Sequence, residues 1–209
     1  LILANDSCYG PIFDLKSVLK KMEQRNCDFW GLSASKWYHI HIQSYFVVLN
    51  NNVLQNDALF NFFSKVEAQS SLSEVCEKYE DQLTYVLNKA GFSFDTYIPY
   101  GNYVNEPYYN VTNSIINAKF PLLKVKTFYG EVGKEPIKDW RKLLLQYTDY
   151  DVSLIEKNLK KRGLTEKDIQ YNLYAKKKTK LYRVFIRKIK KLIKIILYPF
   201  YKILKRFID

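Results

Sequence analysis

The sequence predicts an α/β fold for residues 1–130, followed by helices and a basic C-terminal segment. Short apolar runs typical of strands alternate in this region with segments whose apolar residues recur every three to four positions. Hydrophobic residues make up 47% of the 209 residues and aromatic residues 16%, which is enough to bury a core. With only 7 glycines, the chain is neither fibrous nor of low complexity.

The first expected elements alternate between strand and helix. Residues 1–4 are aliphatic without polar alternation, which predicts a short, fully buried strand. Asp14 can cap a helix that runs to about residue 25, with its apolar side chains on one face. Residues 27–32 predict a second strand. Residues 37–49 predict a long β-rich segment in which alternate side chains point to opposite faces.

Capping signals mark the next two helices. Asp57 can cap a helix to about residue 67, and Ser71 with Glu74 forms a capping-box pattern for a helix that ends near Gly91. The remaining expected elements are strands at 92–98 and 122–128 and helices at 113–118, 137–147, 152–161 and 165–174. A boundary near residues 130–136 divides the chain into an α/β domain (1–130), a helical region (131–175) and a basic segment (176–209).

The positive charge is confined to one end of the chain. The net charge is +12, and residues 176–209 hold 13 of the 33 basic residues and one of the 21 acidic residues. The rest of the chain has 20 of each and is neutral, which argues against a nucleic-acid groove, because such a groove spreads its charge over the folded face. Three cysteines without paired spacing exclude a disulfide framework and favour a reducing compartment.

The basic segment has the pattern of a membrane-surface helix. When residues 182–207 are placed on a helix, apolar and aromatic side chains fall in one sector and Lys/Arg side chains fall opposite. The longest apolar run, 195–201, is far short of the ~20 residues that span a bilayer. The alternatives are a helix that packs on its own domain with a solvated basic face, and a nucleic-acid tail.

Polar residues follow the first expected strand. Side chains at the carboxyl end of a strand in an α/β sheet project into the crevice where ligands bind, so Asn5, Asp6 and Ser7 are candidates for a ligand site. A carboxylate such as that of Asp6 can hold a divalent cation between diphosphate oxygens. The alternative is that these residues only cap the following turn.

Two further segments carry candidate sugar-binding residues. In the second expected strand, Trp30 offers a flat face for a sugar ring, Gly31 allows close backbone approach, and Asp28 supplies a carboxylate. The alternative is a core tryptophan beside a strand-end aspartate. In the β-rich segment, His41, Gln43 and Tyr45 share a face that can bind hydroxyl groups. A metal pair of His41 with His39 is discounted, because no third ligand completes it.

An acidic pair lies in the helix expected at 71–91. Glu80 borders the apolar stripe of this helix, so a partly desolvated Glu80 can serve as a general base. Asp81 is the second candidate. The alternative is an ordinary solvated helical charge.

Several of these segments occur together in one order. They read NDSCYGPIF (5–13), CDFWGLS (27–33), HIQSYF (41–46), YEDQLT (79–84), AGF (90–92) and FPLLK (120–124). The series resembles the rhamnan synthesis protein F family of bacterial glycosyltransferases over about residues 1–126.

The resemblance implies a partial GT-A-like glycosyltransferase domain. The implied donor is dTDP-L-rhamnose or a similar nucleotide sugar, the acceptor is a lipid-linked glycan, and the location is the cytoplasmic face of the bacterial plasma membrane. The family carries a substantial segment before the strand that leads into Asn5, so the resemblance also implies that this chain lacks the N-terminal half of the domain. The rival interpretation is a non-catalytic, membrane-binding remnant or subunit.

The resemblance also assigns roles to residues. Asn5, Asp6 and Ser7 correspond to the metal-binding Asp-x-Asp element, with Mg²⁺ or Mn²⁺ at Asp6, although neither outer position is an aspartate. Glu80, or else Asp81, is the base that deprotonates the acceptor. Lys124 neutralises the leaving diphosphate. Residues 28–31 lie on the acceptor side of the donor sugar.

Overall fold

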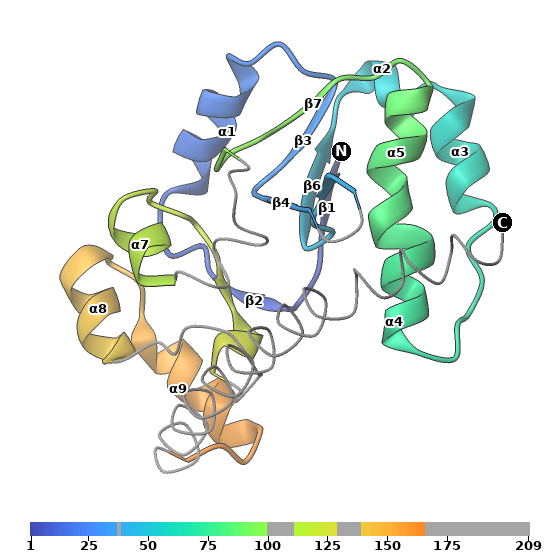
Figure 1. Cartoon of the computed structure of the whole chain (residues 1–209). Coiled ribbons are helices and arrows are strands. Elements are labelled where there is room, and N and C mark those ends of the chain that lie inside the picture. The colour runs from blue at the N-terminus through green and yellow to red at the C-terminus, as the bar shows by residue number, and fades with distance from the viewer. Residues whose placement is uncertain (37–38, 100–110, 129–138, 166–209) are drawn as a thin grey trace, which may run out of the picture.

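The computed structural model describes residues 1–36, 39–99, 111–128 and 139–165. A four-stranded mixed sheet forms its centre, with strand order β1-β6-β3-β7 (Figure 1). These strands span Ile2–Ala4 (β1), Phe46–Leu49 (β6), Phe29–Gly31 (β3) and Phe94–Thr96 (β7). β6 is antiparallel to both of its neighbours, whereas β3 and β7 are parallel. The α/β class predicted from the sequence is confirmed.

Side chains alternate along each strand, so both faces of the sheet carry side chains that can pack against helices. Helices cover both faces. On one face, Val18 and Met22 of α1 (Leu15–Glu23) pack with Trp30 and Phe46. On the other face, Phe29, Val47 and Leu49 pack with three helical segments. Those segments are α2 (Asn51–Leu54), α3 (Asp57–Phe63) and α5 (Asp81–Lys89). Figure 1 shows α1 on one side of the sheet and α3 and α5 on the other.

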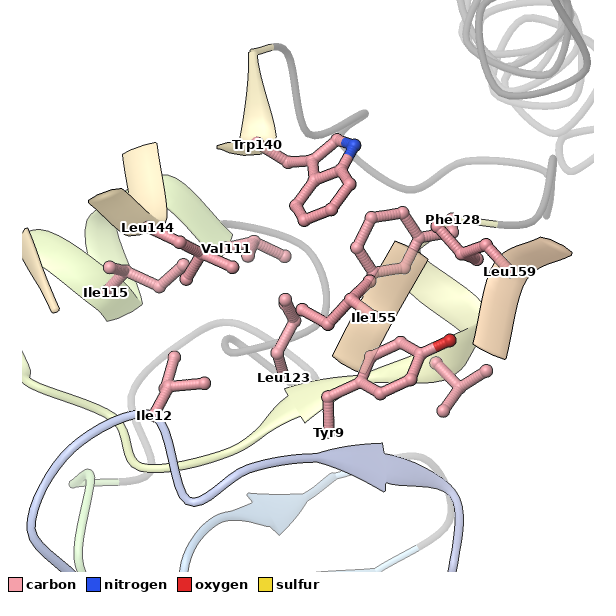
Figure 2. Packing of buried hydrophobic residues seen from close by; sticks show 11 residues of the cluster. Tyr9, Ile12, Val111, Ile115, Leu123, Phe128, Trp140, Leu144, Ile155 and Leu159 are labelled. Carbon is pink, nitrogen blue, oxygen red and sulfur yellow. The ribbon is translucent and has the colours of Figure 1, made fainter. Parts of the chain in front are cut away.

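A second core lies beside the sheet, and eleven buried residues form it (Figure 2). It joins Tyr9 and Leu123, from the two-stranded sheet of β2 and β8, to Leu144 and Ile155 from two later helices. Leu144 and Ile155 are fully buried, and each such side chain contributes about 1.5–3 kcal/mol. The elements are β2 (Cys8–Tyr9), α7 (Val111–Ile116), β8 (Leu123–Lys124), the 3₁₀ turn η2 (Val125–Thr127), α8 (Trp140–Tyr147) and α9 (Val152–Lys161). Residues from the expected helical region therefore share a core with the α/β part.

Several expected helix ends are confirmed. Asp14 caps α1 by accepting from the backbone N–H groups of Lys16 and Ser17. Ser71 caps α4 (Leu72–Val75), which continues through the π-helical turn η1 (Cys76–Glu80) into α5. Gly91 follows that helix with φ +92°, the left-handed conformation that glycine favours at a helix end.

Several details of the expected elements were wrong. Of the strand expected at 122–128, only Leu123–Lys124 is a strand, and Val125–Thr127 is a 3₁₀ turn. The first strand is not fully buried, because β1 lies at the sheet edge and Ile2 is 46% exposed. Residues 37–49 are not one alternating segment: β5 (His41–Ile42) pairs with β4 (Ala34–Ser35) in a separate hairpin, and a turn precedes β6. Asn56, not Asp57, caps α3, because the chain is already helical at residue 57.

Some expectations fall partly or wholly outside the described residues. The basic segment 176–209 and most of the helix expected at 165–174 lie there. The division of the chain near residue 130 stays a prediction. Within the described ranges, no helix is both long and apolar enough to cross a membrane.

Gly31 generates a prediction about how β3 packs against the β4–β5 hairpin and β6. A Cβ at this position would lie 2.2 Å from Ile42 Cγ2 and 3.0 Å from the Phe46 carbonyl oxygen. We therefore expect Gly31→Ala to lower the free energy of unfolding by about 1–3 kcal/mol, measured by urea denaturation. The cost should shrink in an Ile42→Ala background, because that change removes the clashing methyl. Additive costs in the double variant would contradict this contact as the cause.

Candidate functional site

A cavity of about 580 Å³ lies between the sheet edge and the helical segment from α3 to α5. Its walls are largely apolar and come from the sheet, from α3 and from the helix that starts at α4. Among these walls are Leu3, Val47, Phe62, Leu72 and Leu83. Its volume is in the range of ~300–1,000 Å³ that is usual for small-molecule sites.

Polar residues from three distant segments line the same cavity. Asn5 and Ser7 follow β1, Glu80 ends the π-helical turn η1, and Lys124 and Lys126 come from β8 and η2. The structure thus brings together four residues that the sequence singled out: Asn5, Ser7, Glu80 and Lys124. Glu80 is the one carboxylate among the described residues of this lining.

Two contacts hold the Glu80 carboxylate in place. The backbone N–H of Ser44 donates to its Oε1 at 3.3 Å, and the Cys76 thiol donates to its Oε2 at 3.6 Å. Glu80 is half-buried and lies at the end of the π-helical turn, a local widening of the helix that is frequent at functional sites. Burial, followed by the Glu80 charge, raises the pKa of the Cys76 thiol, while the Lys126 charge opposes them. Cys76 is therefore a neutral donor to Glu80 at neutral pH.

A polar seam joins the β5 segment to the start of α5. Its members are His39, His41, Ile42 and Ser44 on one side and Glu80, Asp81 and Thr84 on the other. His41 Nε2 lies 2.9 Å from Asp81 Oδ1, and His39 Nε2–H donates to the Asp81 carbonyl. The Ile42 N–H donates to Thr84 Oγ1 at 2.9 Å, and the Ser44 N–H donates to Glu80 as described above. Because the seam binds both Glu80 and its neighbour, it fixes where the Glu80 carboxylate lies.

The seam places His41 and Asp81 in the interior. Their side chains are 4% and 8% exposed. His41 Nδ1–H donates to the His39 carbonyl at 3.0 Å, so the other ring nitrogen and Asp81 Oδ1 share a proton. Burial raises the pKa of the Asp81 carboxyl above its ordinary value near 3.8, while His41 opposes this and Glu80 adds to it. Asp81 faces His41, and neither residue lines the cavity.

The turn after β1 is ordered by Asn5. Its Oδ1 accepts from the Ser7 N–H at 3.1 Å and from Ser7 Oγ at 2.6 Å, which is an Asx-type turn. Asp6 between them is exposed and does not line the cavity. Within the described ranges, no three His, Cys, Asp or Glu residues lie close enough to share a metal ion. Mg²⁺ or Mn²⁺ at Asp6 stays a prediction.

Lys124 lies over a buried polar network. Its Nζ is 4.3 Å from the centre of the Tyr45 ring, a cation–π contact. The Tyr45 hydroxyl bonds to Ser33 Oγ, which donates to Gln43 Oε1 at 2.8 Å. Burial strongly raises the pKa of Tyr45, so its hydroxyl stays neutral. Gln43 is 4% exposed and belongs to this network, not to the cavity lining.

The other expected sugar-binding residues lie away from the cavity. Asp28 accepts from the Ser93 N–H at 2.7 Å, from Ser93 Oγ and from Asn52, and these bonds lower the pKa of its carboxyl, the Ser93 N–H most. Trp30 is 3% exposed in the core against α1, and Gly31 faces Ile42. Packing and hydrogen bonds within the fold therefore account for Asp28, Trp30 and Gly31 at these positions.

Several residues of the site had no sequence signal. Cys76 and Lys126 lack any motif, and Ser44 and Thr84 stood out only as parts of the segments HIQSYF and YEDQLT. Tyr45 was expected on a hydroxyl-binding face with His41 and Gln43, and of these three it is the one that lines the cavity. The one usable signal was the spacing of Cys76 and Glu80, which lie four residues apart on an expected helix and therefore on one face.

Thr84 generates a prediction about the seam. Thr84→Val removes the acceptor of the Ile42 N–H, and both residues are at most 3% exposed. An unsatisfied buried donor costs about 1–3 kcal/mol, so the free energy of unfolding should fall by that amount. Thr84→Ser keeps the hydroxyl and should recover most of the loss. Equal losses in the two variants, measured by urea denaturation, would contradict the role of this hydrogen bond.

Asp81 generates a prediction about pH. Its pKa is raised in the folded protein, so the folded state binds this proton more tightly than the unfolded chain. The stability it contributes is therefore largest below pH 3.8 and declines as the pH rises through the raised pKa. The difference in unfolding free energy between the native protein and Asp81→Asn should shift in favour of the variant as the pH rises above 3.8. A shift in favour of the native protein would mean that attraction to His41 outweighs burial.

A family model described as rhamnan synthesis protein F matches residues 1–209. The match extends beyond the segments near residues 1–126 that carry the resemblance in the sequence. Comparison with curated proteins finds no match, and neither does comparison with solved structures. The chain belongs to the rhamnan synthesis protein F family, which places it in the synthesis of a polysaccharide.

Proposed function

We propose that the protein is a glycosyltransferase that transfers rhamnose, or a similar sugar, from a dTDP-activated donor to a lipid-linked polysaccharide. The observation that carries the proposal is the convergence of Glu80, Lys124, Asn5 and Ser7 on one cavity. A carboxylate base and a cation for a departing diphosphate are the two groups that an inverting transfer requires. A GT-A-like domain is part of this proposal, supported by the family and by the mixed sheet with helices on both faces.

In the proposed reaction, Glu80 and Lys124 each have one role. The Glu80 carboxylate takes the proton of an acceptor hydroxyl as its oxygen attacks the anomeric carbon of the donor sugar. The bond between that carbon and the diphosphate oxygen breaks, and its electron pair leaves with the nucleotide diphosphate. Lys124 stabilises the charge that develops there. Attack from the face opposite to the leaving group inverts the configuration of the anomeric carbon.

Contacts favour Glu80 over Asp81 as the base. Glu80 lines the cavity, and its two partners donate to the carboxylate without neutralising it. Asp81 is 6% exposed and is occupied by His41. We therefore propose that Asp81 and His41 position the helix that carries Glu80. Asn5 and Ser7, at the same cavity, are the residues we propose to contact the donor.

The proposed location is the cytoplasmic face of the bacterial plasma membrane. The support is the sequence of residues 176–209: if residues 182–207 form a helix, apolar side chains fall opposite Lys and Arg side chains. Each basic residue near an anionic surface contributes about 1 kcal/mol to binding. A lipid-linked acceptor at that surface would meet the enzyme without leaving the membrane.

Glu80→Gln tests the proposal, because glutamine keeps the shape of the side chain but cannot take a proton. We expect transfer of rhamnose from dTDP-L-rhamnose to a lipid-linked acceptor to fall by on the order of 10²–10⁴-fold. Glu77→Gln, an exposed position on the same π-helical turn, is the matched control and should retain activity. Circular dichroism should be unchanged in both. Full activity of Glu80→Gln would remove Glu80 as the base.

A further inference from the structure

Apolar surface continues from the cavity to the outside of the molecule. Four of its lining residues are also large exposed hydrophobics: Phe63 (46% exposed), Val66 (45%), Leu72 (65%) and Val75 (39%). They lie on α3, on α4 and between them, on the side of the sheet opposite to α1 (Figure 1). Apolar surface of this kind, grouped and open to solvent, marks a binding region.

The inner walls of the cavity are also apolar. Phe29, Val47 and Ile42 come from the strands, and Phe62 and Leu83 come from the helices. Against these walls, away from the polar groups of Asn5, Ser7, Glu80 and Lys124, a sugar or a nucleotide would lose hydrogen bonds to water without replacing them. A hydrocarbon chain loses nothing there and gains the free energy of leaving water.

The charged residues of the cavity indicate which head group such a ligand would carry. Lys124 and Lys126 line the cavity with one carboxylate, Glu80, so its described ionisable side chains carry a net positive charge. The Glu80 charge is already stabilised by the Ser44 N–H and the Cys76 thiol. With Lys124 assigned to the donor diphosphate, a phosphate beside the Lys126 ammonium group is the head group that this net positive charge favours.

We propose that the apolar part of the cavity is a lipid-phosphate site, in which a single hydrocarbon chain lies between α3, α4 and the sheet and its phosphate lies against Lys126, while Lys124 faces the donor diphosphate. The lipid site itself does not depend on the proposed function. Only the role of Lys124 and the identification of the bound lipid as the acceptor of the transfer rest on it. In that case the acceptor hydroxyl that reaches Glu80 is close to the lipid, so the acceptor carries a short glycan.

Calorimetry with alkyl phosphates tests the site without requiring turnover. Butyl, hexyl, octyl and decyl phosphate, each below its micelle-forming concentration, should bind the full chain with affinity that rises about two- to fourfold per added methylene. Inorganic phosphate should bind at least a hundredfold more weakly than decyl phosphate. Affinity that is independent of chain length would overturn the proposal.

Matched variants locate the site. Leu72 at the cavity and Leu145 on α8 are both leucines that are 65% exposed, so neither Leu72→Asp nor Leu145→Asp should disturb the core. Leu72→Asp should weaken decyl phosphate binding by tenfold or more, whereas Leu145→Asp should leave it unchanged. Lys126→Gln should weaken decyl phosphate by about threefold to tenfold and leave decanol unaffected. Equal effects of the two leucine variants would overturn the proposal.

Three further outcomes separate this proposal from its rivals. If the chain forms a dimer that Leu72→Asp dissociates and binds no alkyl phosphate, a second copy covers the surface and the lipid site is rejected. If Glu80→Gln abolishes transfer while alkyl phosphates do not bind, the lipid site falls and the proposed function stands. If alkyl phosphates bind as expected while Glu80→Gln remains active, the lipid site stands and the proposed base falls.

Discussion

The polar seam between the β5 segment and the start of α5 is the constraint on which the candidate site depends. A two-residue strand and a helix that follows it by about 40 residues are joined by contacts of His39, His41, Ile42 and Ser44. Ile42 and Thr84 are at most 3% exposed, so their hydrogen bond has little competition from water. The contacts at Glu80, Asp81 and Thr84 fix the rotation of this helix about its own axis.

That rotation separates two adjacent acids. Asp81 enters the interior and meets His41, while Glu80 remains at the cavity between Ser44 and Cys76. One carboxylate is thereby committed to structure and the other is left beside a binding space. The division fits the proposed sugar transfer, which needs one accessible base and a helix that holds it still.

Local signals in the sequence predicted much of the fold. The caps at Asp14 and Ser71 and the glycine at 91 set helix ends correctly, because capping depends on neighbouring residues alone. The exposure of β1 could not be predicted, since it depends on which strand becomes the sheet edge. The turn between β5 and β6 was missed for a similar reason: the alternation from His39 to Phe46 is compatible with one strand, and only the pairing of β5 with β4 shows two.

Many residues of the candidate site could be predicted from the sequence, but not all of the residues that surround them in the fold. Four residues predicted from the sequence line the same cavity, although they are up to about 120 residues apart in the chain: Asn5, Ser7, Glu80 and Lys124. Asp81, His41, Gln43 and Trp30 were also named, and each is engaged in a buried contact away from the cavity. A buried hydrogen bond and a ligand contact use the same side chains, so only the three-dimensional arrangement distinguishes them.

Amide hydrogen exchange at Ile42 tests the central claim most directly. If the seam holds β5 to α5, the Ile42 N–H should exchange as slowly as the amides of β6 in the middle of the sheet, with a protection that reflects global unfolding. Rapid exchange at Ile42, like that of an exposed loop, with β6 still protected, would contradict the account, because the seam would then open on its own and leave Glu80 without a fixed position.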